Sequence, residues 1–353
     1  MKLVAEQGLW TVGPVPPAPP TVAVLELAGA VLAWPVDDPA AQPQLTFTDV
    51  NAADWLWRVT GAAGHVAVLQ ALQGRPADAR DDIEVADLEL SAAALAPLRR
   101  LAIGHWLRRW WPAGVRDGIA DLDLAVLDAE LAVLTAAMQE FFVEDTLDSD
   151  IDGLVRPHRN TFAALLRGGD PRVTALIEAC VEIVDGLDLA ELEPIPARRD
   201  DYALAAGGSG QAAGQPIARG TASVSWSAVP PGIFDAAEDT VDWSVHADDA
   251  GGAVLTVRAE ILAPADGVPV GLWSGDLTAA GVLVADGTAT VALPVSESQA
   301  WNHDWSVTTL TVGSTAVGET RAVRDRLRAL VRDRLSGAPD AFLAEVLAAE
   351  SDY

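Results

Sequence analysis

The spacing of the apolar residues changes three times along this chain of 353 residues. From residue 1 to about 50, short β-branched and apolar runs are broken at Gly29 and by the stretch PVPPAPP, as is typical of strands and turns. Apolar residues then recur every three or four positions over 51–200, alternate over 217–313, and return to helical spacing over 314–353. Helical spacing predicts helices and alternation predicts half-buried strands. The sequence therefore predicts a multi-domain α+β protein.

Two helices are especially clear in the predicted helical domain, residues 51–200. The stretch DLDLAVLDAELAVLTAAMQEFF has an apolar stripe, with Asp121 as the predicted N-cap. The stripe consists of Leu124, Leu127, Leu131, Leu134, Met138 and Phe141. A second helix begins at Pro171 and carries Cys180 on its apolar side, which predicts a buried structural thiol. A single cysteine excludes an intramolecular disulfide and any zinc site of several cysteines.

Residues 201–216 are rich in alanine and glycine and are predicted to form a flexible linker. Beyond it, TASVSWSA, TVDWSVHA and LTVRAEI alternate between apolar and polar residues, and Asp286–Gly287 predicts a tight hairpin. About seven such strands over 217–313 predict an antiparallel β-sandwich. The helical pattern of TRAVRDRLRALVRDRL and PDAFLAEVLAAE predicts a helical extension over 314–353.

The chain is strongly acidic, with 51 acidic residues, 23 basic residues and a formal charge of −28. Such a surface repels nucleic acid and anionic membranes, and it can attract cations or a basic protein. Lys2 is the only lysine, a bias that indicates a GC-rich bacterial genome. Glu6 interrupts any signal-peptide core, and the longest apolar stretch is interrupted by Glu26 and reaches Pro35. We therefore expect a cytoplasmic protein that does not contact a membrane.

One segment, residues 98–116, contains five arginines and no acidic residue, and we call it the arginine island. Its residues predicted to contact a partner are Arg99, Arg100, Trp106, Arg108, Arg109, Trp110 and Trp111. Indole rings can stack on guanidinium groups or on a flat ligand, so one interpretation is a site for an anion or a partner protein. The alternative is a mostly buried helix whose arginines form ion pairs with carboxylates of neighbouring elements. The large number of acidic residues in the chain favours this alternative. We expect an internal partner for at least one of Arg108 and Arg109.

A second basic segment lies in the predicted C-terminal helix, where residues 321–334 hold six arginines and two aspartates. Arg321, Arg324, Arg328 and Arg332 recur at helical spacing and can line one exposed side of the helix. Segregated charge of this kind favours docking on acidic faces within the chain, on another protein or on a second copy. A nucleic-acid contact is the minority interpretation.

The stretch DSDIDG, residues 148–153, resembles the beginning of a calcium loop. Asp148, Asp150 and Asp152 stand at alternate positions before Gly153, as an EF-hand requires, but its twelfth position is Arg159 instead of a glutamate. The EF-hand is thereby excluded. An exposed acidic turn is the favoured interpretation, and a looser Ca²⁺ site at the three aspartates is the weaker one.

The sequence contains no Walker loop, no GxSxG elbow, no HExxH pair and no GxGxxG turn after a strand. His303 and Asp304 are neighbours, but adjacent strand residues point to opposite faces.

We therefore predict no catalytic residue and no cofactor, and expect a non-enzymatic interaction or scaffold subunit of a bacterial cytoplasmic assembly. The alternatives are a hydrolase or metal-dependent enzyme with a nonlinear carboxylate site and, third, an acidic DNA-mimicking inhibitor. A large apolar patch would favour the scaffold, and a pocket of clustered carboxylates the enzyme.

Overall fold

The computed structural model describes residues 1–75, 82–86, 88–142, 146–147, 150–184, 215–314 and 319–351. The chain forms two compact units. Unit 1 comprises Met1–Arg109, Leu122–Ile195 and Arg332–Tyr353, and unit 2 comprises Trp110–Asp121 and Pro196–Val331. Most of the predicted linker, residues 201–214, lies outside the described residues. The predicted division into five segments stays a prediction.

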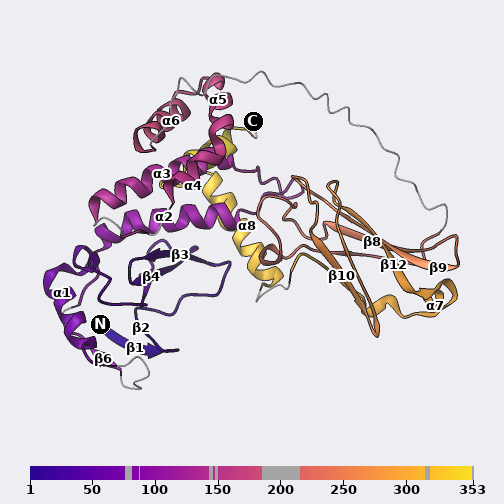
Figure 1. The fold of residues 1–353 in the computed structure, drawn as a ribbon, viewed down its shortest axis with the longest axis horizontal. Helices are drawn as coiled ribbons and strands as arrows, with labels where there is room; N and C mark the ends of the chain where they lie inside the picture. Colours follow the sequence, from indigo (N-terminus) through magenta and orange to yellow (C-terminus); the bar gives the residue numbers. More distant parts are fainter. Residues whose placement is uncertain are drawn as a thin grey trace. The chain divides into compact units, whose positions relative to one another are not determined.

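Unit 1 contains an antiparallel sheet of six strands in the order β3-β4-β5-β2-β1-β6 (Figure 1). The strands are β1 (Lys2–Glu6), β2 (Leu9–Val12), β3 (Val22–Leu27), β4 (Ala30–Pro35), β5 (Gln44–Phe47) and β6 (Ile83–Glu84). The turn between β3 and β4 requires Gly29, because φ there is 72° and a Cβ atom would collide with the carbonyl oxygen of Asp49. The strands predicted for the first 50 residues are confirmed.

Helices make up most of the rest of unit 1. They are α1 (Leu56–Leu72), α2 (Ala92–Trp110, whose last residue belongs to unit 2), α3 (Leu124–Phe141), α4 (Ile151–Val155), the 3₁₀ turn η1 (Arg156–His158), α5 (Arg159–Gly168), α6 (Pro171–Ile183) and α9 (Leu343–Ser351). Helices α2 and α3 run side by side (Figure 1), and a Cβ atom at Gly104 of α2 would collide with Leu131 of α3. The glycine therefore allows the close approach of the two helices.

Helix α3 begins later than the sequence predicts. Its N-cap is Asp123 instead of Asp121, and the Asp123 carboxylate accepts hydrogen bonds from the backbone N–H groups of Ala125 and Val126 at 2.9 and 3.2 Å. Both aspartates precede the apolar stripe, so the residue type alone does not choose between them. Helix α6 begins at Pro171 as predicted, and Cys180 is buried.

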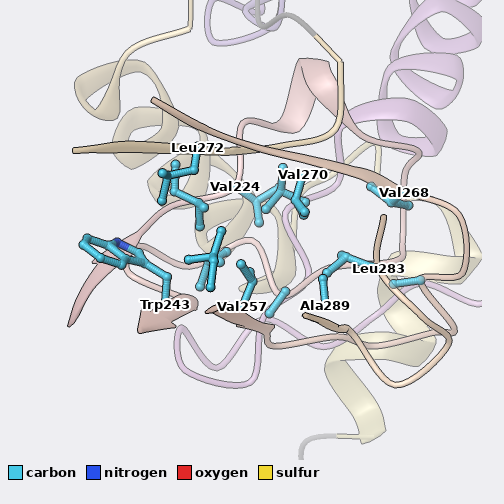
Figure 2. Packing of buried hydrophobic residues seen from close by; sticks show 14 of the residues in the cluster. Val224, Trp243, Val257, Val268, Val270, Leu272, Leu283 and Ala289 are labelled. Carbon is cyan, nitrogen blue, oxygen red and sulfur yellow. The ribbon is translucent and has the colours of Figure 1, made fainter. Parts of the chain in front are cut away.

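Unit 2 contains two antiparallel sheets that pack face to face. One has the order β11-β10-β13 and the other β12-β9-β8-β7. The strands are β7 (Ala218–Ala222), β8 (Val241–Ala247), β9 (Gly252–Ala259), β10 (Pro269–Ser274), β11 (Leu277–Val282), β12 (Thr288–Ser296) and β13 (Thr309–Val312). Val270 and Leu272 from one sheet share a core with Trp243 and Val257 from the other (Figure 2). The predicted β-sandwich is confirmed.

The Asp286–Gly287 turn is a tight hairpin turn as predicted, because the Gly287 N–H donates to the carbonyl oxygen of Val284 at 2.9 Å and the Val284 N–H donates to that of Thr288 at 2.8 Å. It joins β11 to β12, and these strands belong to different sheets, because β11 pairs with β10 and β12 pairs with β9. The turn itself is tight: the Thr288 N–H donates to the Asp286 carboxylate at 3.0 Å, and Gly287 has φ 78°. The dipeptide thus identifies a turn but not the partner of the following strand.

Unit 2 also holds the short elements η3 (Trp226–Ala228), α7 (Glu297–Asn302) and η4 (Trp305–Val307). Helix α8 (Arg321–Leu335) follows the last strand, and the division between the units falls after its residue Val331. Helices α8 and α9 confirm the predicted C-terminal helices. In the part of the chain that the structure describes, no helix is both long and apolar enough to cross a bilayer.

Candidate functional site

The outer face of the three-stranded sheet in unit 2 carries no charged residue, and we call it the Trp273 face. It consists of Pro269, Gly271 and Trp273 on β10, Thr278, Ala280 and Val282 on β11, and Thr309 and Thr311 on β13. Trp273 stands opposite Thr278 and Thr309 in the register, and it is 48 % exposed. Val282, opposite Pro269, is 58 % exposed. Uncharged residues with large exposed apolar side chains thus lie together on this face.

The Trp273 ring lies along its own strand. A Cβ atom added at Gly271 would lie 2.7 Å from Cζ3 of the ring, so only a glycine leaves room for the indole in this position. The ring is therefore held over Gly271 next to small residues. A large, rigid aromatic with little side-chain freedom to lose is typical of the centre of a protein interface.

The outer face of the four-stranded sheet is different. It carries Arg219 on β7, Asp242 on β8 and Arg258 on β9, and the register places Asp242 directly opposite Arg258. Opposite charges at facing positions are an ordinary feature of a solvated sheet surface. The contrast shows that the Trp273 face is not simply the average surface of this sandwich.

The arginines at the middle of α2 border a cleft in unit 1. The Arg99 Nη2 group donates to the carbonyl oxygen of Asp38 at 3.2 Å. Arg100 donates to the carbonyl oxygens of Asp340 and Ala341 at 2.8 and 3.4 Å. Within the described ranges of the chain, neither arginine forms an ion pair with a carboxylate.

Arg108, further along α2, has an internal partner. Its Nε donates to Asp128 at 2.6 Å, and the other oxygen of this buried carboxylate lies 2.8 Å from Nε2 of His158. Burial, and then the positive charge of Arg108, lower the pKa of nearby His105. The structure thus gives Arg108 the carboxylate partner that the sequence favours.

The tryptophans of the arginine island are anchored by hydrogen bonds. The indole N–H of Trp106 donates to the carbonyl oxygen of Pro20 at 2.6 Å, and that of Trp111 to Ala120 at 2.8 Å. Arg109 and Trp110 also make interactions of their own. Trp106 is 3 % exposed, so no face of this ring is available to a ligand.

Two arginines of α8 point into unit 2 instead of lining an exposed side. Arg324 binds both oxygens of Glu238 at 2.7 and 2.8 Å and Glu319 at 3.1 Å. Arg328 lies 3.0 Å from Glu238, 2.9 Å from Asp117 and 2.8 Å from Asp325. Arg321 and Arg332 are exposed, whereas Arg324 and Arg328 between them are not. The prediction that all four arginines line one exposed side of the helix is therefore wrong for the middle two. The reason is that inward-facing carboxylates balance the two middle charges.

The acidic turn is only partly described. Asp148 lies outside the described residues. Asp150 is the N-cap of α4 and accepts from the Gly153 N–H at 2.8 Å, while Asp152 pairs with Arg156 at 2.7 Å. The described segments contain no group of three or more His, Cys, Asp or Glu residues that could hold a metal ion.

Ser274 and His303 form the contact that comes nearest to a nucleophile and its base. Nε2 of His303 lies 2.8 Å from Oγ of Ser274, which is also 2.8 Å from Oγ1 of Thr308. A serine nucleophile must be reachable by its substrate. Ser274 is completely buried, so this contact joins two segments of the sandwich and offers no reactive hydroxyl.

The Trp273 face is not visible in the sequence alone. Alternation shows that Gly271 and Trp273 share one side of a strand, but only the register brings residues of β11 and β13 beside them. Comparison with protein-family models, curated proteins and solved structures finds no match to this chain.

Proposed function

We propose that the protein is a non-enzymatic interaction subunit of a bacterial cytoplasmic assembly and that a partner protein docks on the Trp273 face. The observation that carries this proposal is a charge-free sheet face, centred on an exposed tryptophan, in a chain of formal charge −28. Docking there removes no charged side chain from water, so the desolvation cost is low. An exposed apolar patch is the feature expected of a scaffold.

The negative net charge of the chain also indicates which charge the partner protein should carry. A second copy of this chain, or any other strongly acidic protein, is repelled as it approaches. The complementary partner is a different protein that has an apolar docking surface surrounded by basic residues. Its apolar centre would cover Trp273 and its rim would be attracted by the acidic surroundings.

The test is affinity capture from a lysate of the bacterial host, with the wild-type chain compared to Trp273→Ser. Trp301→Ser is the matched control, because Trp301 is 53 % exposed but belongs to α7 and not to the Trp273 face. We expect one specific partner that is kept by wild type and by Trp301→Ser. Loss of a central tryptophan typically costs about 2 kcal/mol or more, so Trp273→Ser should weaken binding at least about 30-fold.

Thermal melts establish that both variants are folded. Equal capture by all three proteins would contradict the proposal. A concentration-dependent dimer of the chain in size-exclusion chromatography, broken by Trp273→Ser, would identify a second copy as the occupant and would overturn the proposed partner.

A further inference from the structure

A cleft in unit 1 lies beside the first half of α2. It has a volume of about 600 Å³ and is bordered by Trp34, Pro39, Leu90, Leu95 and Ala96 together with the two arginines. Trp34 and Leu95 are buried, and so provide an apolar interior. Small-molecule sites are typically apolar clefts of about 300–1,000 Å³ with a few polar groups, and this cleft has that size and composition.

Arg99 is the polar group that lacks an ionic partner. Its Nε atom is buried and has no hydrogen-bond partner, and its one hydrogen bond goes from Nη2 to the carbonyl oxygen of Asp38. Burial lowers the pKa of this guanidinium, which means that the surroundings disfavour its charge. A partly desolvated cation without an ion pair is costly, although the chain has 51 acidic and 23 basic residues that could supply a partner.

The charged side chains that border the cleft are Arg99, Arg100 and Asp340. Arg100 donates to two backbone carbonyls and its guanidinium lies 4.6 Å from the centre of the Phe342 ring, while the nearby carboxylate of Glu130 interacts with it only at longer range. The only acidic residue that borders the cleft, among those described, is Asp340, and it is 3.3 Å from Arg334. The border of the cleft therefore carries two guanidinium groups and one carboxylate that is shared with Arg334, and the negative charge of nearby Asp38 also acts on Arg99.

We propose that this cleft binds a small organic acid with an apolar body and a single carboxylate. The carboxylate binds the terminal guanidinium nitrogens of Arg99, and the planar guanidinium is well suited to a carboxylate. The body of the ligand lies against Trp34, Leu90 and Leu95. A monoanion matches the one guanidinium, that of Arg99, that has neither an ion pair nor a second hydrogen bond, whereas a phosphate monoester carries close to two negative charges at neutral pH. This site is independent of the Trp273 face, which belongs to the other unit.

Titration calorimetry of the full chain with octanoate and 4-phenylbutyrate tests the proposal, with octanol, octylamine and octyl phosphate as probes of the headgroup. We expect at least one acid to bind at a concentration of about 1 mM or below. Octanol should bind more weakly, and octylamine should not bind. Absence of binding by both acids at about 1 mM would overturn the proposal.

Arg99→Gln should weaken binding of the acid at least tenfold. Arg167→Gln is the matched control, because it removes the same charge from an exposed position of unit 1 outside the cleft. Ala96→Phe, which fills the cleft and keeps Arg99, should also abolish binding and decides the question if Arg99→Gln does not fold. Unchanged affinity in the variants, or equal binding of octanol and octanoate, would contradict an anion site. Tighter binding of octyl phosphate would assign the cleft to phosphate esters instead.

Discussion

Arg324 and Arg328 on α8 are surrounded by carboxylates inside unit 2, whereas Arg99 and Arg100 on α2 donate hydrogen bonds only to backbone carbonyls at a cleft in unit 1. In the first pair, the side chain of Arg328 is 4 % exposed and three carboxylates lie within 3.0 Å of it. Its charge is fully used within the fold. In the second pair, backbone carbonyl groups accept hydrogen bonds from the guanidinium N–H groups, but a carbonyl group carries no net charge and does not neutralise the arginine. The carboxylates around Arg328 indicate a structural role, and the absence of an ion pair at Arg99 is the observation on which the proposed anion site rests.

The largest effect is expected for Arg328→Ala. The mutation removes the most buried cation from an ionic network with Glu238, Asp117 and Asp325, in which Glu238 keeps only Arg324, and such changes typically cost about 3–5 kcal/mol. Urea unfolding followed by tryptophan fluorescence measures the loss of stability. Arg326→Ala, an exposed neighbour on α8, serves as the control and should change stability by about 0.5 kcal/mol or less. A loss below about 1 kcal/mol for Arg328→Ala would show that the network is dispensable and would weaken the contrast between the two pairs.

The pH dependence of the same network gives the second prediction. Burial alone would raise the pKa of Glu238, but hydrogen bonds from Arg324, Ser223 and Arg328 outweigh it and lower the pKa from 4.5 to about 2. A carboxylate with a lowered pKa in the folded state stabilises the protein above pH 4.5, and this contribution is lost as the pH falls toward 2. Wild type should therefore be more stable than Glu238→Gln at pH 6, and the difference should shrink between pH 4.5 and 3. A difference in unfolding free energy that stays constant over this range would contradict the lowered pKa.

The spacing of apolar residues was sufficient to predict the N-terminal strands, the central helices and the sandwich, because each period reports which side of a local element is buried. The spacing was not sufficient where the structure depends on contacts between segments that are far apart in the sequence. Asp286 and Gly287 specify a tight turn, but whether the following strand joins the same sheet depends on β9, with which β12 pairs. Asp121 and Asp123 are equally suitable caps by residue type, and only the structure shows that Asp123 is the one that caps α3.

The surroundings of the arginines could not be predicted from spacing either. Arg328 has the same helical interval from its neighbours as Arg321 and Arg332, yet it is buried because Asp117 and Glu238 approach it from distant parts of the sequence. Arg99 and Arg100 are adjacent in an acidic chain, which favours internal carboxylates, but the groups that reach them are the carbonyls of Asp38 and Asp340. The chemistry of a contact thus depended on tertiary neighbours that no local pattern reports.

The smallest effect is expected for Arg99→Gln. The mutation removes one hydrogen bond to the Asp38 carbonyl, but it also removes a partly desolvated charge that has no carboxylate partner. These two terms oppose each other, so the stability should change by about 1 kcal/mol or less, in contrast to Arg328→Ala. Urea unfolding of Arg99→Gln beside Arg167→Gln measures the difference for the same change of charge. A loss of about 3 kcal/mol or more would place Arg99 with Arg328 as a structural cation and would remove the distinction between the two arginine pairs. A stability close to that of Arg167→Gln would instead show that the fold does not depend on the charge of Arg99, as expected for a residue that serves a ligand.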